Sequence, residues 1–230
     1  MFQTSDSLKK FALIVAGGKG LRMSSQIPKQ FLELEGKPVL MRSIEAFTSF
    51  DPLMEIILVL PEDQIRYWNE LCKEYSFNTE VTLANGGENR IESVRNGLSK
   101  INSEGIVFIH DGVRPLVSQQ TIQNCKEGAL KNGSAIPVIK LTDSIRQLTD
   151  GKNVSVDREK YRLIQTPQTF EIKLIKEAFV DAKGSHFTDD ASVFEAAGQT
   201  VTLVEGNIEN IKITRSVDLK IANMLFTENK

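Results

Sequence analysis

Short apolar segments alternate with longer amphipathic ones along most of the 230-residue chain. The short segments are rich in β-branched residues and are bounded by glycine or proline, as buried strands are. The longer segments repeat apolar residues every three or four positions, as Ile65, Trp68 and Leu71 do, which predicts helices. Strands are predicted over 11–16, 55–60, 80–84, 106–110 and 134–139, and helices over 38–47, 62–75 and 89–98.

This alternation predicts an α/β fold with a mostly parallel sheet between helix layers. The length suits one domain over 1–230. The C-terminal part predicts a helix over 171–182, another that Thr188 caps and that runs to Gly198, strand residues over 200–204 and 211–213, and a final helix from Ser216.

The pattern changes between residues 141 and 165. Residues 142–148 and 154–156 have the pattern of two strands, and the intervening Asp150-Gly151 is a strong hairpin signal. A protruding β-hairpin of this kind, inserted in an α/β domain, is expected to be an arm that reaches a second subunit. A plain surface hairpin is the alternative.

Composition narrows the classes of protein. Hydrophobic content of 40% with 25% charged residues is ordinary for a soluble globular protein. The net charge of −2 argues against a dedicated nucleic-acid binder, so any anionic ligand should be small. The apolar run after Lys10 is too short for a signal peptide, and no later run could span a bilayer. Cys72 and Cys125 are expected to be buried free thiols, which suits a cytoplasmic location.

A glycine-rich turn follows the first predicted strand. Gly17, Gly18 and Gly20 lack Cβ atoms, so their backbone N–H groups can approach phosphate oxygens, and Arg22 and Lys29 add positive charge. The spacing matches neither the dinucleotide fingerprint nor the Walker loop. The turn therefore points to an enzyme that handles a nucleoside triphosphate, with an ordinary tight turn and two surface cations as the alternative.

Two further polar clusters follow later strands, and in a parallel sheet all three should meet in the crevice beyond the carboxyl ends. Gly87 and Ser93 could approach a base or ribose, although a helix N-terminus with Glu88 near its dipole explains the same spacing. Asp111 is suited to hold Mg²⁺ against a triphosphate, or is a turn residue.

Two other residues near these clusters carry weaker signals. His110 ends a buried strand and is expected to be structural rather than catalytic. Lys212 lies among apolar residues and could be a third cation at reacting phosphates; a strand-edge lysine is the ordinary explanation.

Taken together and in order, the clusters resemble those of the 2-C-methyl-D-erythritol 4-phosphate cytidylyltransferase family, from about Phe11 to the final helix. The motifs are Ala16-Gly-Gly-Lys-Gly-Leu-Arg-Met23, Pro28-Lys-Gln30, Gly86-Gly-Glu-Asn-Arg90 with Ser93, His110-Asp-Gly-Val-Arg-Pro115, Thr166-Pro-Gln168, Thr188-Asp-Asp-Ala-Ser192 and Glu205 to Thr214. Ribitol-5-phosphate cytidylyltransferases share nearly all of them, so the motifs indicate the reaction better than the polyol.

The resemblance implies a Rossmann-like nucleotidyltransferase fold and a role for each matching residue. Catalytic roles fall to Arg22 and Lys29, which would stabilise the transition state, and to Arg158 and Lys212, which would position the polyol phosphate. CTP would contact Ala16, Gly17, Gly18, Gly20, Gly87, Glu88, Ser93 and Gly112. The polyol phosphate would also have Ser144 and Thr166 nearby, and Mg²⁺ would be held by Asp111 and Glu209. The arm would exchange across a homodimer, so that Ser144 and Arg158 would serve the partner's site.

Five positions depart from the commoner family pattern: Leu21, Glu88, Gly112, Ser144 and Glu209. Four of these changes preserve charge or size, and Leu21 lies outside the implied catalytic set. The implied activity is transfer of a cytidylyl group from CTP to 2-C-methyl-D-erythritol 4-phosphate, with release of pyrophosphate. Ribitol phosphate as acceptor, a non-catalytic nucleotide-binding protein and a sugar-phosphate uridylyltransferase are the alternatives.

Overall fold

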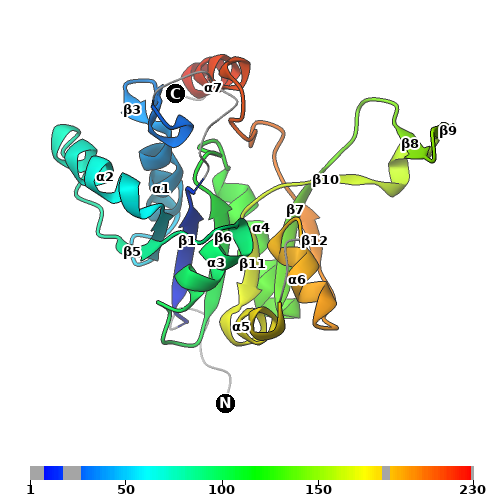
Figure 1. Ribbon diagram of the computed structural model, residues 1–230, viewed down its shortest axis with the longest axis horizontal. Coiled ribbons are helices and arrows are strands. Elements are labelled where there is room, and N and C mark those ends of the chain that lie inside the picture. Colours follow the sequence, from blue (N-terminus) through cyan, green and yellow to red (C-terminus); the bar gives the residue numbers. More distant parts are fainter. Residues whose placement is uncertain (1–7, 18–26, 183–186, 229–230) are drawn as a thin grey trace.

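The computed structural model describes residues 8–17, 27–182 and 187–228, and its central feature is a mixed sheet (Figure 1). In these ranges eight strands form the sheet, in the order β10-β7-β11-β6-β1-β4-β5 with β12 also paired to β7. The strands are β1 (Lys10–Val15), β4 (Glu55–Leu60), β5 (Thr82–Asn85), β6 (Ile106–Asp111), β7 (Ser134–Lys140), β10 (Arg162–Ile164), β11 (Gln168–Glu171) and β12 (Leu203–Glu205).

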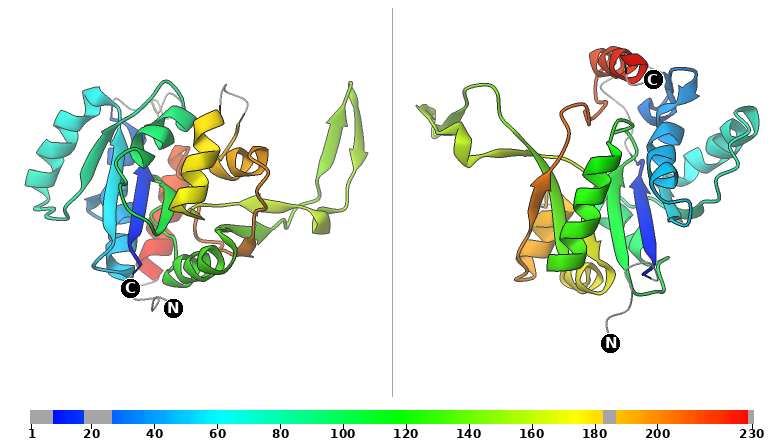
Figure 2. Two further views of the ribbon diagram at one scale, coloured as in Figure 1. Left: turned by 90° about the horizontal axis from the view of Figure 1, so that it is seen from below. Right: turned by 180° about the vertical axis from the view of Figure 1, so that it is seen from behind.

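Helices cover both faces of this sheet, as Figures 1 and 2 show. One face packs against α3 (Arg90–Leu98), α5 (Ile172–Asp181) and α6 (Asp190–Ala196). The other packs against α1 (Val39–Phe50), α2 (Glu62–Glu74) and α4 (Gln119–Asn132). Because β1 and β6 are buried from both sides, they are nearly continuous apolar runs. The predicted α/β fold is confirmed.

A smaller apolar cluster joins the remaining elements beside the sheet. It packs α7 (Ser216–Glu228) against the short hairpin of β2 (Glu33–Leu34) and β3 (Lys37–Pro38), around Leu34, Val39 and Ala222. A short 3₁₀ turn, η1 (Lys29–Phe31), precedes β2. Among the described ranges, no helix combines the length and apolar content that a membrane span needs.

Parallel pairing aligns the ends of the strands that matter for the site. β1 pairs in parallel with β4 and β6, and Val15 lies opposite Asp111. Gly17, which follows β1 closely, and Asp111 therefore lie at the same edge of the sheet. One feature was not predicted: β11 inserts antiparallel between β6 and β7, pairing Phe170 with Val107 and Ser134.

The predicted arm is present as a separate two-stranded hairpin of β8 (Arg146–Thr149) and β9 (Lys152–Ser155), projecting from the body (Figures 1 and 2). Asp150 and Gly151 at its turn have φ angles of 48° and 76°, which is the left-handed pair that a two-residue hairpin turn requires. Every residue of both strands is exposed. The hairpin leads into a 3₁₀ turn, η2 (Arg158–Lys160).

Some local predictions need correction. Residues 211–213 form no strand, and β12 begins at Leu203 rather than at residue 200. Cys125 is buried as expected, and burial raises the pKa of its thiol to about 12, but Cys72 is only partly buried. The N-cap of α6 is Asp189 rather than Thr188, because the Asp189 carboxylate accepts hydrogen bonds from Ser192 N at 3.0 Å and Gln168 Nε2 at 2.8 Å.

This cap assignment makes a stability prediction. Asp189→Ala should lower the free energy of unfolding by about 1–2 kcal/mol, because it removes the cap and the acceptor for Gln168. Thr188→Ala, one position earlier, is the matched control and should cost less. Urea unfolding of both variants measures the difference, and equal losses would contradict the assignment.

Candidate active site

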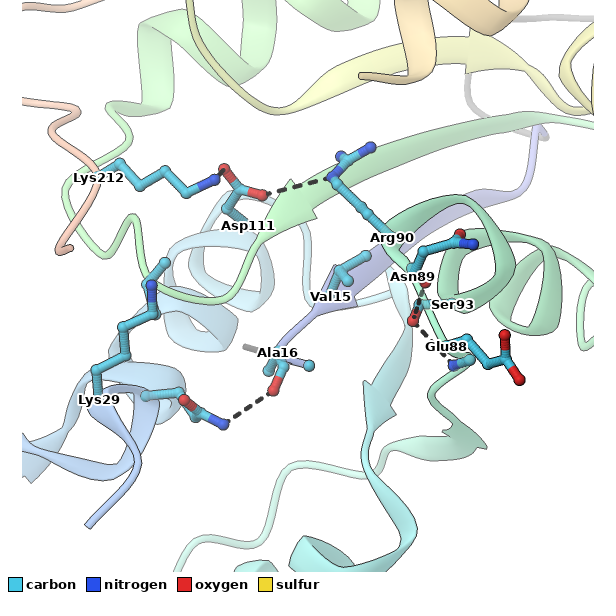
Figure 3. A pocket seen from close by; sticks show the side chains of 13 residues that line it. Val15, Ala16, Lys29, Glu88, Asn89, Arg90, Ser93, Asp111 and Lys212 are labelled. Carbon is cyan, nitrogen blue, oxygen red and sulfur yellow. Dashed lines mark hydrogen bonds and ion pairs between the residues drawn. The ribbon is translucent and has the colours of Figure 1, made fainter. Parts of the chain in front are cut away.

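A pocket of about 270 Å³ opens where the carboxyl ends of β1 and β6 meet the start of α3. η1 and the segment that carries Lys212 complete its wall (Figure 3). The lining residues are Val15, Ala16, Gly17, Lys29, Gln30, Gly87, Glu88, Asn89, Arg90, Ser93, Asp111, Val113 and Lys212. Five segments of the chain therefore form one concave site, at the place where an open α/β sheet binds ligands.

Three cations surround the Asp111 carboxylate. Lys212 Nζ lies 2.9 Å from Oδ2, Arg114 Nε lies 3.3 Å from Oδ2, and Arg90 Nε lies 3.9 Å from Oδ1. Burial alone would raise the pKa of Asp111, but Lys212, Arg90 and Arg114 outweigh it and hold that pKa well below its usual range. The carboxylate is therefore ionised at neutral pH.

The backbone at Asp111 is fixed by a chain of hydrogen bonds. Asp111 N donates to Thr166 Oγ1 at 3.1 Å, and Thr166 Oγ1 lies 3.1 Å from His110 Nδ1. His110 Nε2 donates to the Arg114 carbonyl at 3.0 Å, so Nδ1 is the unprotonated nitrogen and accepts from the Thr166 hydroxyl. Burial lowers the pKa of His110 to about 4. The imidazole is thus a neutral structural link, as its place in the sequence predicted.

Arg90, the first residue of α3, joins the pocket to α6 on the same face of the sheet. Its guanidinium binds the fully buried Asp190 carboxylate through two bonds, Nη1 to Oδ1 at 2.7 Å and Nη2 to Oδ2 at 2.6 Å. Burial would lower the pKa of Arg90, but Asp190 and Asp111 raise it above its ordinary value, so the cation is permanent. Bidentate geometry fixes the plane of the guanidinium at the pocket wall.

The start of α3 is a closed polar turn. Ser93 Oγ accepts from Gly87 N at 3.0 Å and donates to the Asn89 carbonyl at 2.9 Å. Asn89 caps the helix by accepting from Glu92 N, and a Cβ on Gly87 would lie 2.3 Å from that of Glu92. Glycine at position 87 is thus required by packing against the helix. Ser93 is buried rather than a surface residue.

The structure brings most of the predicted site residues together. Ala16, Gly17, Lys29, Gly87, Glu88, Ser93, Asp111 and Lys212 line the pocket. Figure 3 shows Lys212 and Asp111 pointing toward one another, with Ser93 and Glu88 across the pocket. Thr166 lies behind Asp111 as its backbone acceptor. Gly18, Gly20 and Arg22 lie outside the described residues.

Four predicted residues lie elsewhere. Gly112 faces the core, where a Cβ would lie 2.8 Å from Leu40 Cδ1, and its N–H and carbonyl are already bonded to Val15 and Ser43. Glu209 accepts from Asn207 and lines a separate depression beside α1 and α7. Ser144 and Arg158 lie on the exposed arm. Gly112 and Glu209 therefore do not join the pocket of their own chain.

Five pocket residues carried no individual role in the sequence prediction: Val15, Gln30, Asn89, Arg90 and Val113. The last four lie inside quoted motifs. The sequence offered one signal for Arg90, a cation that directly follows the helix cap Asn89. Its partner Asp190 could not be predicted from spacing, because it lies 100 residues away in the sequence.

The fold and this cationic, glycine-lined pocket define the class of protein: an α/β nucleotidyltransferase. The chain belongs to a particular family of that class, 2-C-methyl-D-erythritol 4-phosphate cytidylyltransferase, whose family model matches residues 11–228.

Named relatives and solved structures agree. A protein of that name from Phocaeicola vulgatus is 53% identical over 218 residues, covering 95% of this chain and all of the relative, and one from Geobacillus thermodenitrificans is 37% identical, covering 93% and 95%. The crystal structure of 4-diphosphocytidyl-2C-methyl-D-erythritol synthase from Anaerococcus prevotii has a TM-score of 0.83 at 28% identity, covering 96% and 97% of the two chains. The Francisella tularensis cytidylyltransferase has a TM-score of 0.77 at 31% identity, covering 94% and 99%.

Proposed function

We propose that this protein transfers the cytidylyl group of CTP to 2-C-methyl-D-erythritol 4-phosphate, forming 4-diphosphocytidyl-2-C-methyl-D-erythritol and pyrophosphate. This step belongs to the non-mevalonate synthesis of isoprenoid precursors. The observation that carries the proposal is the cluster of Lys212, Arg90 and Arg114 around Asp111, beside the glycine end of β1. Family membership over nearly the whole chain supports it. A cytoplasmic location belongs to the same proposal.

The chemistry needs charge neutralisation more than proton transfer. A phosphate monoester has its second pKa near ~6, so the acceptor is largely a dianionic nucleophile at neutral pH. Its oxygen attacks the α-phosphorus of CTP, a new P–O bond forms, and the bond to the β-phosphate breaks in line. Lys29 and Lys212, with Arg22, stabilise the charge that spreads over the phosphoryl oxygens. This explains why, among the residues that the structure describes, no histidine is available for catalysis, since His110 is buried and neutral.

Of the two predicted magnesium ligands, Asp111 and Glu209, only Asp111 is placed to bind the ion at the pocket. Within the part of the chain that the structure describes, no three His, Cys, Asp or Glu side chains gather to hold a metal. Mg²⁺ commonly takes one or two carboxylates together with substrate phosphates, so Asp111 alone is sufficient. When bound, the ion would neutralise part of the triphosphate charge. Glu209 does not fit, because it lines a different depression.

Ser93 supports cytosine selection through the direction of its hydrogen bonds. Its proton is committed to the Asn89 carbonyl, so its oxygen can only accept from a further group. The exocyclic amine of cytosine can donate to it, and the keto oxygen of uracil cannot. The buried hydroxyl thus favours CTP over UTP.

Ser93→Ala should narrow the CTP-to-UTP ratio of kcat/KM by about tenfold, the worth of one good hydrogen bond. Ser99→Ala is the matched control, because the Ser99 hydroxyl donates to Asn96 at the other end of α3. Steady-state kinetics with both nucleotides measure the ratio. An equal loss for CTP and UTP would mean that Ser93 only supports the turn.

The arm residues support a homodimer with exchanged arms. Arg158 donates to the Thr142 carbonyl, and its Nε lies 3.7 Å from Glu159 Oε1, so both of these partners belong to the arm region 141–165. None of the residues that line the pocket comes from the arm. The arm and the strand after it expose Leu148, Val154 and Leu163. An exchanged arm would bury this apolar surface and bring Arg158 and Ser144 to the partner's pocket.

Mixing two inactive variants tests the exchange. With Arg158→Ala in one chain and Lys212→Ala in the other, a mixed dimer has one site with both defects and one intact site. Because about half of randomly mixed dimers are mixed, roughly a quarter of wild-type activity should return. Each variant alone is the control. No recovery after verified subunit exchange would show that the arm serves its own chain.

The first experiment is pyrophosphate release from CTP and Mg²⁺, with 2-C-methyl-D-erythritol 4-phosphate and ribitol 5-phosphate in parallel. Turnover with the first alone supports the proposal. Turnover with ribitol phosphate alone would move the protein to polyol metabolism, and CTP binding without turnover would favour a binding protein.

A further inference from the structure

Gln30 is a buried amide at the pocket, 1% exposed, that makes two bonds through one nitrogen. Nε2 donates to the Ala16 carbonyl at 2.9 Å and to Gln64 Oε1 at 2.7 Å. Ala16 is the residue directly after β1, and Gln64 lies in the first turn of α2. One side chain therefore links η1, the end of β1 and α2.

The direction of both bonds is determined by Ala16. A backbone carbonyl can only accept, so the NH₂ group of Gln30 must face it, and the Gln64 atom on the same nitrogen must then be an oxygen. Position 30 thus needs two donors, whereas position 64 needs only an acceptor. These unequal requirements separate the two positions experimentally.

The same amide fixes the residue before it. Lys29 begins η1, whose turn closes through Phe31 N to the Pro28 carbonyl at 2.9 Å. Phe31 packs edge-on against Tyr67 of α2 with ring centroids 5.1 Å apart. This apolar contact holds η1 on α2, and the Gln30 amide ties η1 to the residue that follows β1.

We propose that Gln30 is a positioning residue for the transfer step. Its two donors hold Lys29 at a set distance from Ala16 and Gly17, where the triphosphate is proposed to lie, and Gln64 orients the amide. The inference rests on the proposed cytidylyl transfer. A displacement of about 1 Å at a catalytic group can cost about 100-fold in rate. Loss of the Gln30 hydrogen bonds would let Lys29 shift and should therefore lower kcat.

Four variants test the directions of the bonds. Gln30→Met keeps the length and neutrality of the side chain but has no donor, and should lower kcat about 10- to 100-fold with little change in KM for CTP. Gln64→Glu keeps the acceptor, so its kcat should stay within about twofold of wild type. Gln64→Met removes the acceptor, and its kcat should lie between those of wild type and Gln30→Met. Gln120→Glu, an exposed helix amide that donates to Asn124, is the control for the chemical change.

Hydrogen exchange of the peptide spanning residues 27–34 provides a readout that needs no turnover. Gln30→Met should speed exchange there, and Gln64→Glu should not. The proposed function is tested separately, by turnover of the wild-type protein, so its failure can be distinguished from a failure of the inference about Gln30. Unchanged kcat in Gln30→Met, equal losses in Gln64→Glu and Gln64→Met, or unchanged exchange in Gln30→Met would overturn the inference. If Gln30→Met does not fold, the two Gln64 variants still decide it.

Discussion

Lys29→Ala should lower kcat by about 100- to 1,000-fold, with a much smaller rise in KM for CTP. Lys29 begins η1 and lines the pocket together with Lys212 and the glycine end of β1. In Figure 3 its side chain runs from η1 along the side of the pocket that holds Asp111 and Lys212. A cation placed there gains most when charge moves from the α-phosphate to the leaving pyrophosphate. Its interaction is therefore stronger in the transition state than in the bound ground state.

The matched control is Lys37→Ala. Lys37 is a partly exposed lysine on the neighbouring β3 that pairs with Glu45 and does not line the pocket. It should leave kcat within about twofold, since surface ion pairs contribute little. Steady-state kinetics, with CTP affinity measured separately by calorimetry, distinguish the two steps. A raised KM at unchanged kcat would reduce Lys29 to a binding residue.

Local patterns predicted the parts of the fold that depend on neighbouring residues. β1 and β6 were evident as apolar runs ended by glycine or a polar cluster, and their parallel pairing places Val15 opposite Asp111. The hairpin turn at Asp150 and Gly151 followed from left-handed backbone geometry that few residue pairs adopt. The meeting of Gly17, the start of α3 and Asp111 at one pocket then followed from the topology of parallel sheets.

Long-range pairing accounts for what the sequence did not reveal. β11 is short and carries polar residues that are buried only because β6 and β7 flank it, so no local signal marks Gln168 or Thr169 as strand residues. The Arg90–Asp190 pair likewise joins two helix starts that are 100 residues apart in the sequence. Such contacts depend on the assembled core rather than on sequence spacing.

Resemblance located motifs along the chain but not the direction of each side chain. Gly112 follows Asp111 directly, yet successive residues at a strand end face opposite ways, so it points toward Leu40 and the core. Glu209 precedes Lys212 by one short turn, and its carboxylate accepts from Asn207 instead of facing Asp111. Residues that are adjacent in a motif can therefore belong to different surfaces.

Asp111→Asn is expected to lower kcat by about 100-fold or more. The amide keeps the shape of the side chain but removes the charge that balances Lys212, Arg90 and Arg114. Lys212 Nζ would lose its charged partner at 2.9 Å, so its side chain would be held less firmly. The neutral amide would also bind the proposed magnesium ion more weakly than the carboxylate does. Asp63→Asn, at an exposed position in the first turn of α2, is the control.

The pH dependence of stability separates the structural part of this effect. Burial opposes ionisation of Asp111, but the cations depress its folded pKa below the unfolded value near ~3.9. Its stabilising contribution is therefore complete above that unfolded value and is lost as the pH falls toward the folded pKa. Urea midpoints of wild type and Asp111→Asn should differ most near neutrality and converge below about pH 4.

A magnesium titration separates the catalytic part. If Asp111 holds the metal, Asp111→Asn should need a higher Mg²⁺ concentration for half-maximal activity, and its kcat should recover partly at saturation. An unchanged midpoint with the same loss of kcat would instead assign Asp111 to holding Lys212. In that case Lys212→Ala and the double variant Asp111→Asn with Lys212→Ala should have nearly equal rates, because the two residues would act as one unit.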